Sequence, residues 1–133
     1  MAALDINVLI RFVVQDDAAQ GAAAARSIRS GVQAGSALFV PVTVLLDLEW
    51  VLRSAFGFDK AAVLHALFRL LGSFELGFES ESAVEVAVAQ YARSSADFAD
   101  CLHAALAGQA GEQPLWTFDK AAAKVDGARL LTA

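Results

Sequence analysis

The sequence is poor in cysteine and has no long apolar run. Its one cysteine, Cys101, excludes a disulfide within the chain and fits the reducing cytoplasm, where we expect the protein to reside. A membrane-spanning helix needs about 20 consecutive apolar residues. The longest apolar stretch, residues 38–46, is shorter and contains Pro41 and Thr43. The sequence therefore predicts no membrane partner.

Positive charge is also scarce. The chain has 10 Lys and Arg residues against 15 Asp and Glu residues, which gives a formal net charge of −5 at pH 7. A nucleic-acid partner usually needs a basic surface. This balance therefore argues against such a partner, unless the acidic residues gather where metal ions neutralise them.

Predicted helices and strands alternate along the 133 residues. The length favours one domain, residues 1–133. Apolar periodicity predicts helices over residues 8–12, 18–33, 42–57, 60–72, 79–95, 96–111 and 119–125, and strands at 3–5, 38–41, 74–76, 114–117 and 128–131. This order is typical of an α/β protein. We expect three α/β/α layers, with helices on both faces of a central, mainly parallel sheet of four or five strands.

Acidic residues interrupt the apolar segments at four places. In parallel sheets, ligand sites lie beyond the carboxyl ends of the strands, and Asp5 and Asp119 both follow predicted strands. Asp5 also lies in a run that resembles core, where an unpaired carboxylate costs several kcal/mol. The other acids are two pairs on predicted helices, Asp47 with Glu49 and Asp97 with Asp100.

Helix geometry decides which members of these pairs can act together. Asp97 and Asp100 lie about 60° apart on their helix, whereas Asp47 and Glu49 lie about 160° apart, so only one of the latter can face a shared site. Carboxylates gathered in one pocket raise each other's pKa unless a cation neutralises them. Oxygen-rich clusters usually hold Mg²⁺ or Mn²⁺, and such ions assist phosphodiester hydrolysis.

Each acid also has an ordinary structural explanation. Asp5 and Asp119 can cap the helices that follow them, and Asp97 suits a first helical turn because of the helix dipole. Glu49 is expected to be a solvated surface residue. Asp100 is harder to explain in this way, because aspartate is a poor helix former inside a helix.

Other reactive or aromatic side chains favour structural roles. His103 is three residues after Asp100, but we expect a packed or partly exposed histidine rather than a catalytic one. His65 lies on an apolar helix and is expected to be structural. Cys101 is interpreted as a small buried residue, and the aromatic side chains Trp50 and Phe56 as core or interface residues.

Four segments in order along the whole chain resemble the PIN-domain ribonucleases of the VapC toxin type. They are LDINVLIR (4–11), TVLLDLEWVLRSAFG (43–57), ADFADCLHAALA (96–107) and LWTFDKAAAKV (115–125). The resemblance implies a Rossmann-like PIN fold with an acidic pocket for Mg²⁺ or Mn²⁺. It also implies endonucleolytic cleavage of RNA, and neutralisation by a VapB-like antitoxin.

The resemblance assigns roles to individual positions. It implies that Asp5, Asp47, Asp100 and Asp119 are catalytic, and that Asp5, Asp97, Asp100 and Asp119 bind the metal. Asn7 and Thr117 match the supporting polar positions. Arg11, Lys120 and Lys124, which follow Asp5 and Asp119 closely, are candidates for RNA contact. Two positions depart from the pattern: Ile6 stands where the family commonly has threonine, and Asp47 where it usually has glutamate.

Three other functions compete with this interpretation. A PIN-fold binding module without nuclease activity would fit the departures at Ile6 and Asp47. A phosphatase of the haloacid-dehalogenase type also places an aspartate after the first strand, but it needs a second one two residues later, where this chain has Asn7. A dinucleotide-binding domain is disfavoured because no Gly-x-Gly-x-x-Gly follows the first strand.

The helices predicted over residues 42–56 and 61–71 carry more apolar side chains than one core face needs. We therefore expect them to form a two-fold homodimer interface, which the resemblance also suggests.

Overall fold

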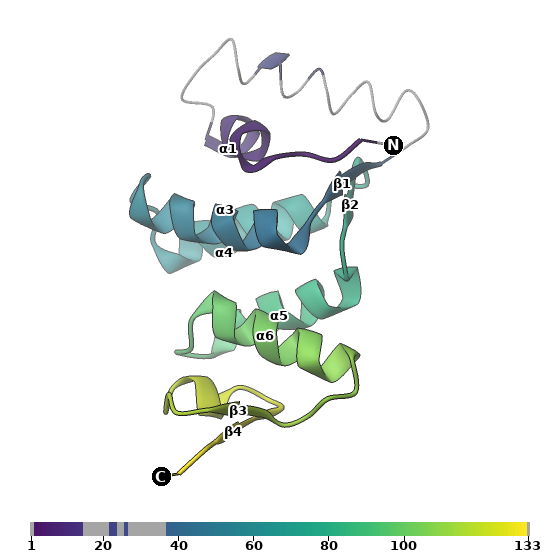
Figure 1. Cartoon of the computed structure of the whole chain (residues 1–133). Helices are drawn as coiled ribbons and strands as arrows, with labels where there is room; N and C mark the ends of the chain where they lie inside the picture. Colours follow the sequence, from purple (N-terminus) through teal and green to yellow (C-terminus); the bar gives the residue numbers. More distant parts are fainter. Residues whose placement is uncertain (1, 15–21, 24–25, 27–36, 133) are drawn as a thin grey trace. The chain divides into compact units, whose positions relative to one another are not determined.

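The computed structural model describes residues 2–14, 22–23, 26 and 37–132, and the chain divides into two compact units, residues 1–79 and 80–133 (Figure 1). The single domain expected from the length stays a prediction, and each unit is described by itself. Apart from residues 22–23 and 26, the helix expected over residues 18–33 lies outside the described residues. Among the helices of the described ranges, none is long and apolar enough to cross a membrane.

The first unit is built on three parallel extended segments. Its elements are α1 (Ile6–Val14), β1 (Leu38–Val40), α3 (Val42–Ser54), α4 (Lys60–Leu71) and β2 (Leu76–Phe78). Strand β1 pairs with β2 on one edge, with Leu38 opposite Leu76. On its other edge Phe39 forms a parallel bridge with Ala3, in which the Leu4 N–H donates to the Phe39 carbonyl at 2.9 Å. The residues just before α1 therefore run beside β1.

The backbone N–H groups at the starts of α3 and α4 are hydrogen-bonded in different ways. Helix α3 follows Pro41, whose side chain offers no acceptor, and the Val42 N–H donates instead to Oε1 of Glu79 at 2.8 Å. Helix α4 is capped by Asp59, which accepts from the Ala62 N–H at 2.8 Å, as the sequence predicts. Gly57 supplies the positive φ, 68°, that the turn between the two helices requires.

Strand β2 lies two residues later than predicted, at Leu76–Phe78 instead of 74–76. Phe74 is exposed, and the Leu76 N–H donates to the Ser73 carbonyl at 3.2 Å, which closes a turn just before the strand. Leu76 and Phe78 are the buried pair. The alternation that marks the strand therefore begins at Leu76.

The second unit contains α5 (Glu81–Arg93), α6 (Phe98–Gln109), β3 (Leu115–Thr117), the 3₁₀ turn η1 (Ala122–Lys124) and β4 (Ala128–Leu130). Helices α5 and α6 pack against each other through buried side chains, and the ring centroids of Tyr91 and Phe98 lie 5.5 Å apart. Strands β3 and β4 are parallel, with Trp116 opposite Arg129. The helix predicted over 119–125 is shorter, a 3₁₀ turn of three residues.

The predicted α/β class with parallel strands is confirmed. The described strands form two parallel pairs, one in each unit. One continuous sheet of four or five strands stays a prediction.

Candidate acidic site

Asp100 is a partly buried acid of the second unit with other charged side chains nearby. It lies in the first turn of α6 and is partly buried. Burial raises its pKa, and the negative charges of Asp97 and Asp119 raise it further, while His103 lowers it. The structure therefore brings Asp97, Asp100 and Asp119 close enough for their charges to interact, although Asp119 is distant in the sequence.

Asp97 occupies the position just before α6. Its backbone is extended there, as an N-cap residue requires, yet within the described part of the chain its side chain makes no capping hydrogen bond. The Asp97 carboxylate is exposed. The ordinary explanation for Asp97 is an acid of the first helical turn, but Asp97 lies one residue before that turn, at the N-cap position.

Asp119 follows β3 and is held by its own backbone surroundings. Its Oδ1 accepts from the N–H groups of Ala121, at 2.8 Å, and Ala122, at 3.2 Å, so the predicted capping role is present. The Asp119 N–H donates to Oγ1 of Thr117 at 3.0 Å. Thr117 thus supports Asp119, and the carboxylate is oriented through Oδ1 while Oδ2 takes no part in these bonds.

The candidate site acids of the first unit lie on α3 and at the start of α1, two helices that pack against each other. Asp5 immediately precedes α1, and its Oδ1 accepts from the Ile6 N–H at 2.8 Å. Both Asp5 and Asp47 are exposed, as is Asn7. The burial cost expected for Asp5 is therefore wrong: Leu4 is buried, but the chain turns into α1 at Asp5 and leaves its carboxylate in solvent.

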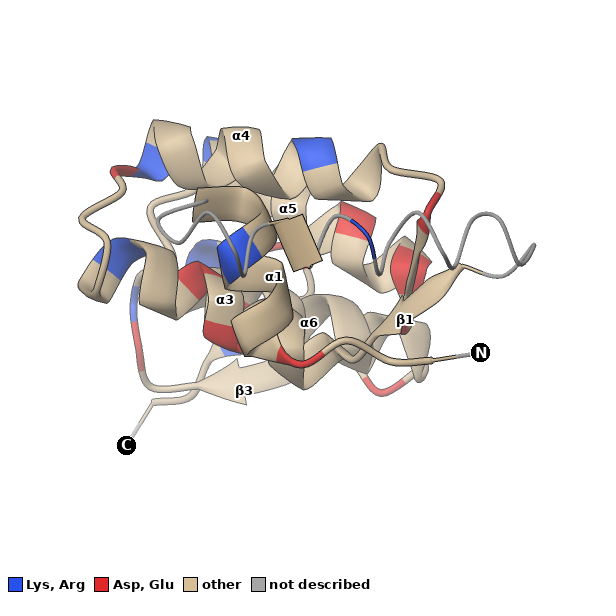
Figure 2. Ribbon diagram, turned by 90° about the horizontal axis from the view of Figure 1, so that it is seen from above, with Lys and Arg blue, Asp and Glu red and all other residues tan. Residues whose placement is uncertain are grey.

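The burial of Glu49 contradicts a second expectation from the sequence. Glu49 is 2% exposed rather than a solvated surface residue. Its carboxylate pairs with Arg53, one turn later on α3, through Nε and through Nη2, the latter at 3.1 Å. Figure 2 shows the acidic positions of α3 in red beside α1. Of the two acids on α3, Asp47 is the exposed one and Glu49 is a buried structural residue.

The positively charged candidates differ in exposure. Lys120 and Lys124 are exposed and Arg11 is half-buried. His103 is exposed on α6, within the range of electrostatic interaction with Asp100. Cys101 is buried, as predicted.

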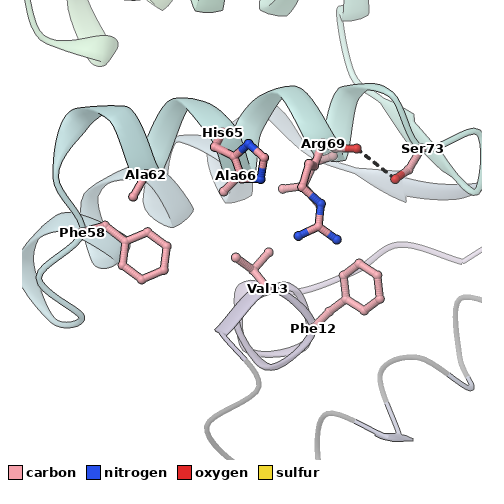
Figure 3. Close-up of a pocket in the computed structure, with 9 residues that line it drawn as sticks. Phe12, Val13, Phe58, Ala62, His65, Ala66, Arg69 and Ser73 are labelled. Carbon is pink, nitrogen blue, oxygen red and sulfur yellow. Dashed lines mark hydrogen bonds between the residues drawn. The ribbon is translucent and has the colours of Figure 1, made fainter.

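A cavity of about 210 Å³ lies between α1 and α4 in the first unit (Figure 3). Arg69 and His65 reach from α4 toward Phe12 and Val13 of α1, and the Ser73 hydroxyl donates to the Arg69 carbonyl at 3.0 Å. His65, expected to be a structural residue of an apolar helix, is exposed and lines this cavity. None of the described residues that line the cavity is acidic, so its lining differs in chemistry from the candidate acidic site.

The donor set fits a hard divalent cation. Among the described residues, no three His, Cys, Asp or Glu side chains are already arranged to hold a metal ion. The second unit nevertheless groups carboxylates whose repulsion raises the pKa of Asp100. Carboxylate oxygens are the ligands that Mg²⁺ and Mn²⁺ prefer, and a cation would relieve this repulsion.

A protein-family model for the PIN domain matches residues 2–128, a range that includes all the acids discussed above. The chain belongs to the PIN domain family. PIN domains are typically nucleases, and those nucleases use divalent metal ions. No curated protein matches the chain.

Two side-chain pairs of this PIN domain were missed by the sequence reasoning. The first is Glu49 with Arg53, which the apolar stripe of α3 indicates once Leu45, Leu48 and Leu52 are taken together. The second is Trp116 with Arg129, in which the guanidinium carbon lies 5.7 Å from the ring centroid. That pair depends on strand register, which the sequence alone does not supply.

Proposed function

We propose that this PIN domain is a metal-dependent endoribonuclease and the toxin of a VapBC-type toxin–antitoxin pair. The observation that carries the proposal is the grouping of Asp97, Asp100 and Asp119 in a chain whose family typically consists of nucleases. The helix dipole favours an acid in the first turn of α6, where Asp100 lies, but it does not account for two further carboxylates nearby. A purely structural residue gains nothing from two nearby like charges.

We assign different roles to the acids according to their positions. The proposed ligands of Mg²⁺ or Mn²⁺ are Asp5, Asp97, Asp100 and Asp119, and Asp47 acts directly or through water. When bound, the cation offsets the charge of the phosphate and favours ionisation of the attacking water. The two N–H bonds to Oδ1 of Asp119 hold that carboxylate in one orientation before RNA arrives.

The basic residues complete the proposal. Arg11, Lys120 and Lys124 are proposed to contact the RNA backbone, and the last two are exposed close to Asp119 in the sequence. A cation among the carboxylates reconciles the net charge of −5 with a polyanionic substrate. The exposed side chains of Lys120 and Lys124 are the positive charges that follow Asp119 in the sequence.

The proposed partners are RNA, a VapB-like antitoxin and a second copy of the chain. Exposed aromatic side chains on both α3 and α4 support the homodimer. Trp50 on α3 is 60% exposed and Phe68 on α4 is 53% exposed, although both helices also face the core. Large apolar surface of this kind is typical of subunit contacts.

The deciding experiment is cleavage of total cellular RNA by purified protein with Mg²⁺, with Mn²⁺ and with EDTA. Wild type is expected to cut only with a divalent ion, and Asp5→Asn and Asp100→Asn to lower the rate about 100-fold or more, the scale of losing an essential catalytic group. Glu85→Gln, an exposed charge on α5, is the matched control and keeps full activity. Equal cutting by all four proteins would assign the activity to a contaminant. Intact RNA under every condition would favour a binding module.

A further inference from the structure

Trp116 and Arg129 form an exposed pair on the two parallel strands of the second unit. They are register partners across β3 and β4. The Arg129 guanidinium lies over the indole at 5.7 Å, within the range of a cation–π interaction. Trp116 nevertheless remains 53% exposed. The interaction therefore fixes a positive charge beside a flat apolar surface that is still open to solvent.

The pair does not serve the core of its unit. The buried residues there come from α5, α6 and the η1 segment, whereas Trp116 and the nearby Phe118 are mainly exposed, Phe118 at 71%. Single exposed apolar side chains are common, but here two aromatic side chains close in the sequence are exposed and one of them is paired with a guanidinium. A ring next to a fixed guanidinium complements an unpaired nucleotide, because the base stacks on a flat surface and the phosphate takes the charge.

The pair is attached directly to the candidate acidic site. Trp116 is three residues before Asp119, which limits the distance between their Cα atoms to about 11 Å. Thr117, between them, both continues the β3 ladder and binds the Asp119 N–H. Lys120, on the other side of Asp119, is exposed and adds positive charge. A nucleotide on Trp116 would therefore lie within a few nucleotides of a phosphate at Asp119.

We propose that Trp116 and Arg129 form a nucleotide-binding subsite, in which Trp116 stacks on one unpaired base of the RNA and Arg129 binds a phosphate beside it. This inference rests on the proposed function, since the nucleotide belongs to the RNA that is cut. It adds a subsite that positions the RNA and does not include the acidic residues. It also predicts a preference for single-stranded over fully paired RNA near the cleaved bond.

Binding without cleavage tests the subsite. The chain has two tryptophans, so Trp50→Phe leaves Trp116 as the sole indole. In EDTA, a short single-stranded RNA is expected to quench the fluorescence of this variant. By anisotropy, Trp116→Ala is expected to weaken binding about 10-fold, within the range for one stacked base, and Trp116→Phe to weaken it less. Arg129→Ala should weaken binding and reduce its salt dependence. Phe74→Ala, which removes an exposed aromatic side chain outside the proposed RNA and dimer surfaces, is the matched control.

A second set of binding experiments changes the RNA instead of the protein. Abasic substitution at one position of the oligonucleotide should lower wild-type affinity about as much as Trp116→Ala does, and the two changes together should cost little more than either alone. Annealing the complementary strand should abolish the effect of Trp116→Ala. The proposal is overturned if Trp116→Ala and Arg129→Ala leave RNA affinity unchanged, or if they alter only the oligomeric mass, which would assign the pair to a protein contact.

The outcome is separate from that of the nuclease test. If Trp116-dependent binding occurs but no condition produces cleavage, the proposed nuclease is wrong and the nucleotide subsite stands. If cleavage occurs and Trp116→Ala changes neither affinity nor KM, the nuclease stands and the subsite is wrong.

Discussion

Single carboxylates in this PIN domain serve the backbone while keeping an oxygen available for chemistry. Oδ1 of Asp119 accepts two backbone N–H groups, and Oδ1 of Asp5 accepts one. The sequence set capping and metal binding against each other as alternatives at both positions. The bonds to Oδ1 of Asp119 cap the turn that follows it and leave Oδ2 available, so both interpretations of Asp119 hold. Oδ1 of Asp5 accepts from the N–H of the adjacent Ile6 and not from the second or third N–H of the helix, so this bond is not the expected capping bond.

Asp100 gives the clearest prediction at the residue scale. Its pKa is raised above the ordinary value of 3.8. Between that value and the raised pKa, the folded chain binds more protons than the unfolded chain, so the free energy of unfolding falls as pH rises through this window. In EDTA at pH 7, Asp100→Asn is expected to be more stable than wild type by about 0.2–0.5 kcal/mol, the scale of like-charge repulsion on a helix.

Adding Mn²⁺ should make wild type more stable than Asp100→Asn. Only wild type keeps the full set of carboxylates, and binding of the ion to the folded state adds stability. Urea unfolding at pH 7 and below pH 3.8, with EDTA and with Mn²⁺, measures both effects. Glu85→Gln controls for the loss of one negative charge from the same unit. If Asp100→Asn is no more stable than wild type in EDTA, the interaction with Asp97 and Asp119 is too weak to matter.

Glu49 shows what the sequence contained but the reasoning missed. Leu45, Leu48, Glu49 and Leu52 follow the spacing of an apolar helical stripe, and all four are buried. Helix geometry places Asp47 and Glu49 about 160° apart, and Glu49 is the one that is buried while Asp47 is exposed. The arginine one turn later, Arg53, was the signal that a glutamate in this stripe can be buried.

At the scale of elements, most predicted helices and strands are present, and their bounds differ by a few residues. The start of α4 at its Asp59 cap and the starts of β1 and α3 lie where periodicity and turn residues placed them. Strand β2 was displaced because Phe74 resembles a strand residue, and only its exposure reveals the turn. The pairing of Trp116 with Arg129 could not be predicted, since register between distant strands depends on the packing of everything between them.

The pair on α3, in which Glu49 is buried and Arg53 is partly exposed, predicts that one substitution costs more than two. Arg53→Ala removes a counter-charge from a carboxylate that is 2% exposed, and is expected to destabilise the protein by about 1–2 kcal/mol, less than for a fully buried pair because the Arg53 side chain is 38% exposed. Replacing both residues, with Glu49→Leu and Arg53→Met, should be close to neutral because no buried charge is left. The urea midpoints of the two proteins test this expectation, with Arg93→Ala as control for the exposed pair with Asp126. Equal destabilisation by the single and double changes would contradict it.

At the scale of the whole molecule, class and family were accessible from the sequence and assembly was not. The α/β class follows from the alternation of elements, and the four quoted segments span nearly the whole range that the PIN-domain model matches. The pairing of strands across long segments, by contrast, is set by packing that no local pattern records. The exposed aromatic side chains of α3 and α4 make the oligomeric state the test at this scale.

The homodimer prediction concerns the outer surface of α3 and α4, two helices that pack against each other. We expect wild type to elute as a dimer in size-exclusion chromatography with light scattering at micromolar concentration. Phe68→Arg places a charge on the exposed apolar surface of α4 and should weaken the dimer by about 30-fold, as expected for a residue that contributes roughly 2 kcal/mol to an interface. Trp50→Ala should act in the same direction, because Trp50 is also mainly exposed.

Phe74→Arg is the matched control for this change. Phe74 is exposed as well, but it lies in the turn before β2, outside the two helices. A monomeric wild type would contradict the prediction, and equal dissociation by both arginine variants would place the contact elsewhere. Dimerisation that requires Phe68 but not Phe74 would explain why these helices carry apolar side chains beyond those that their core face buries.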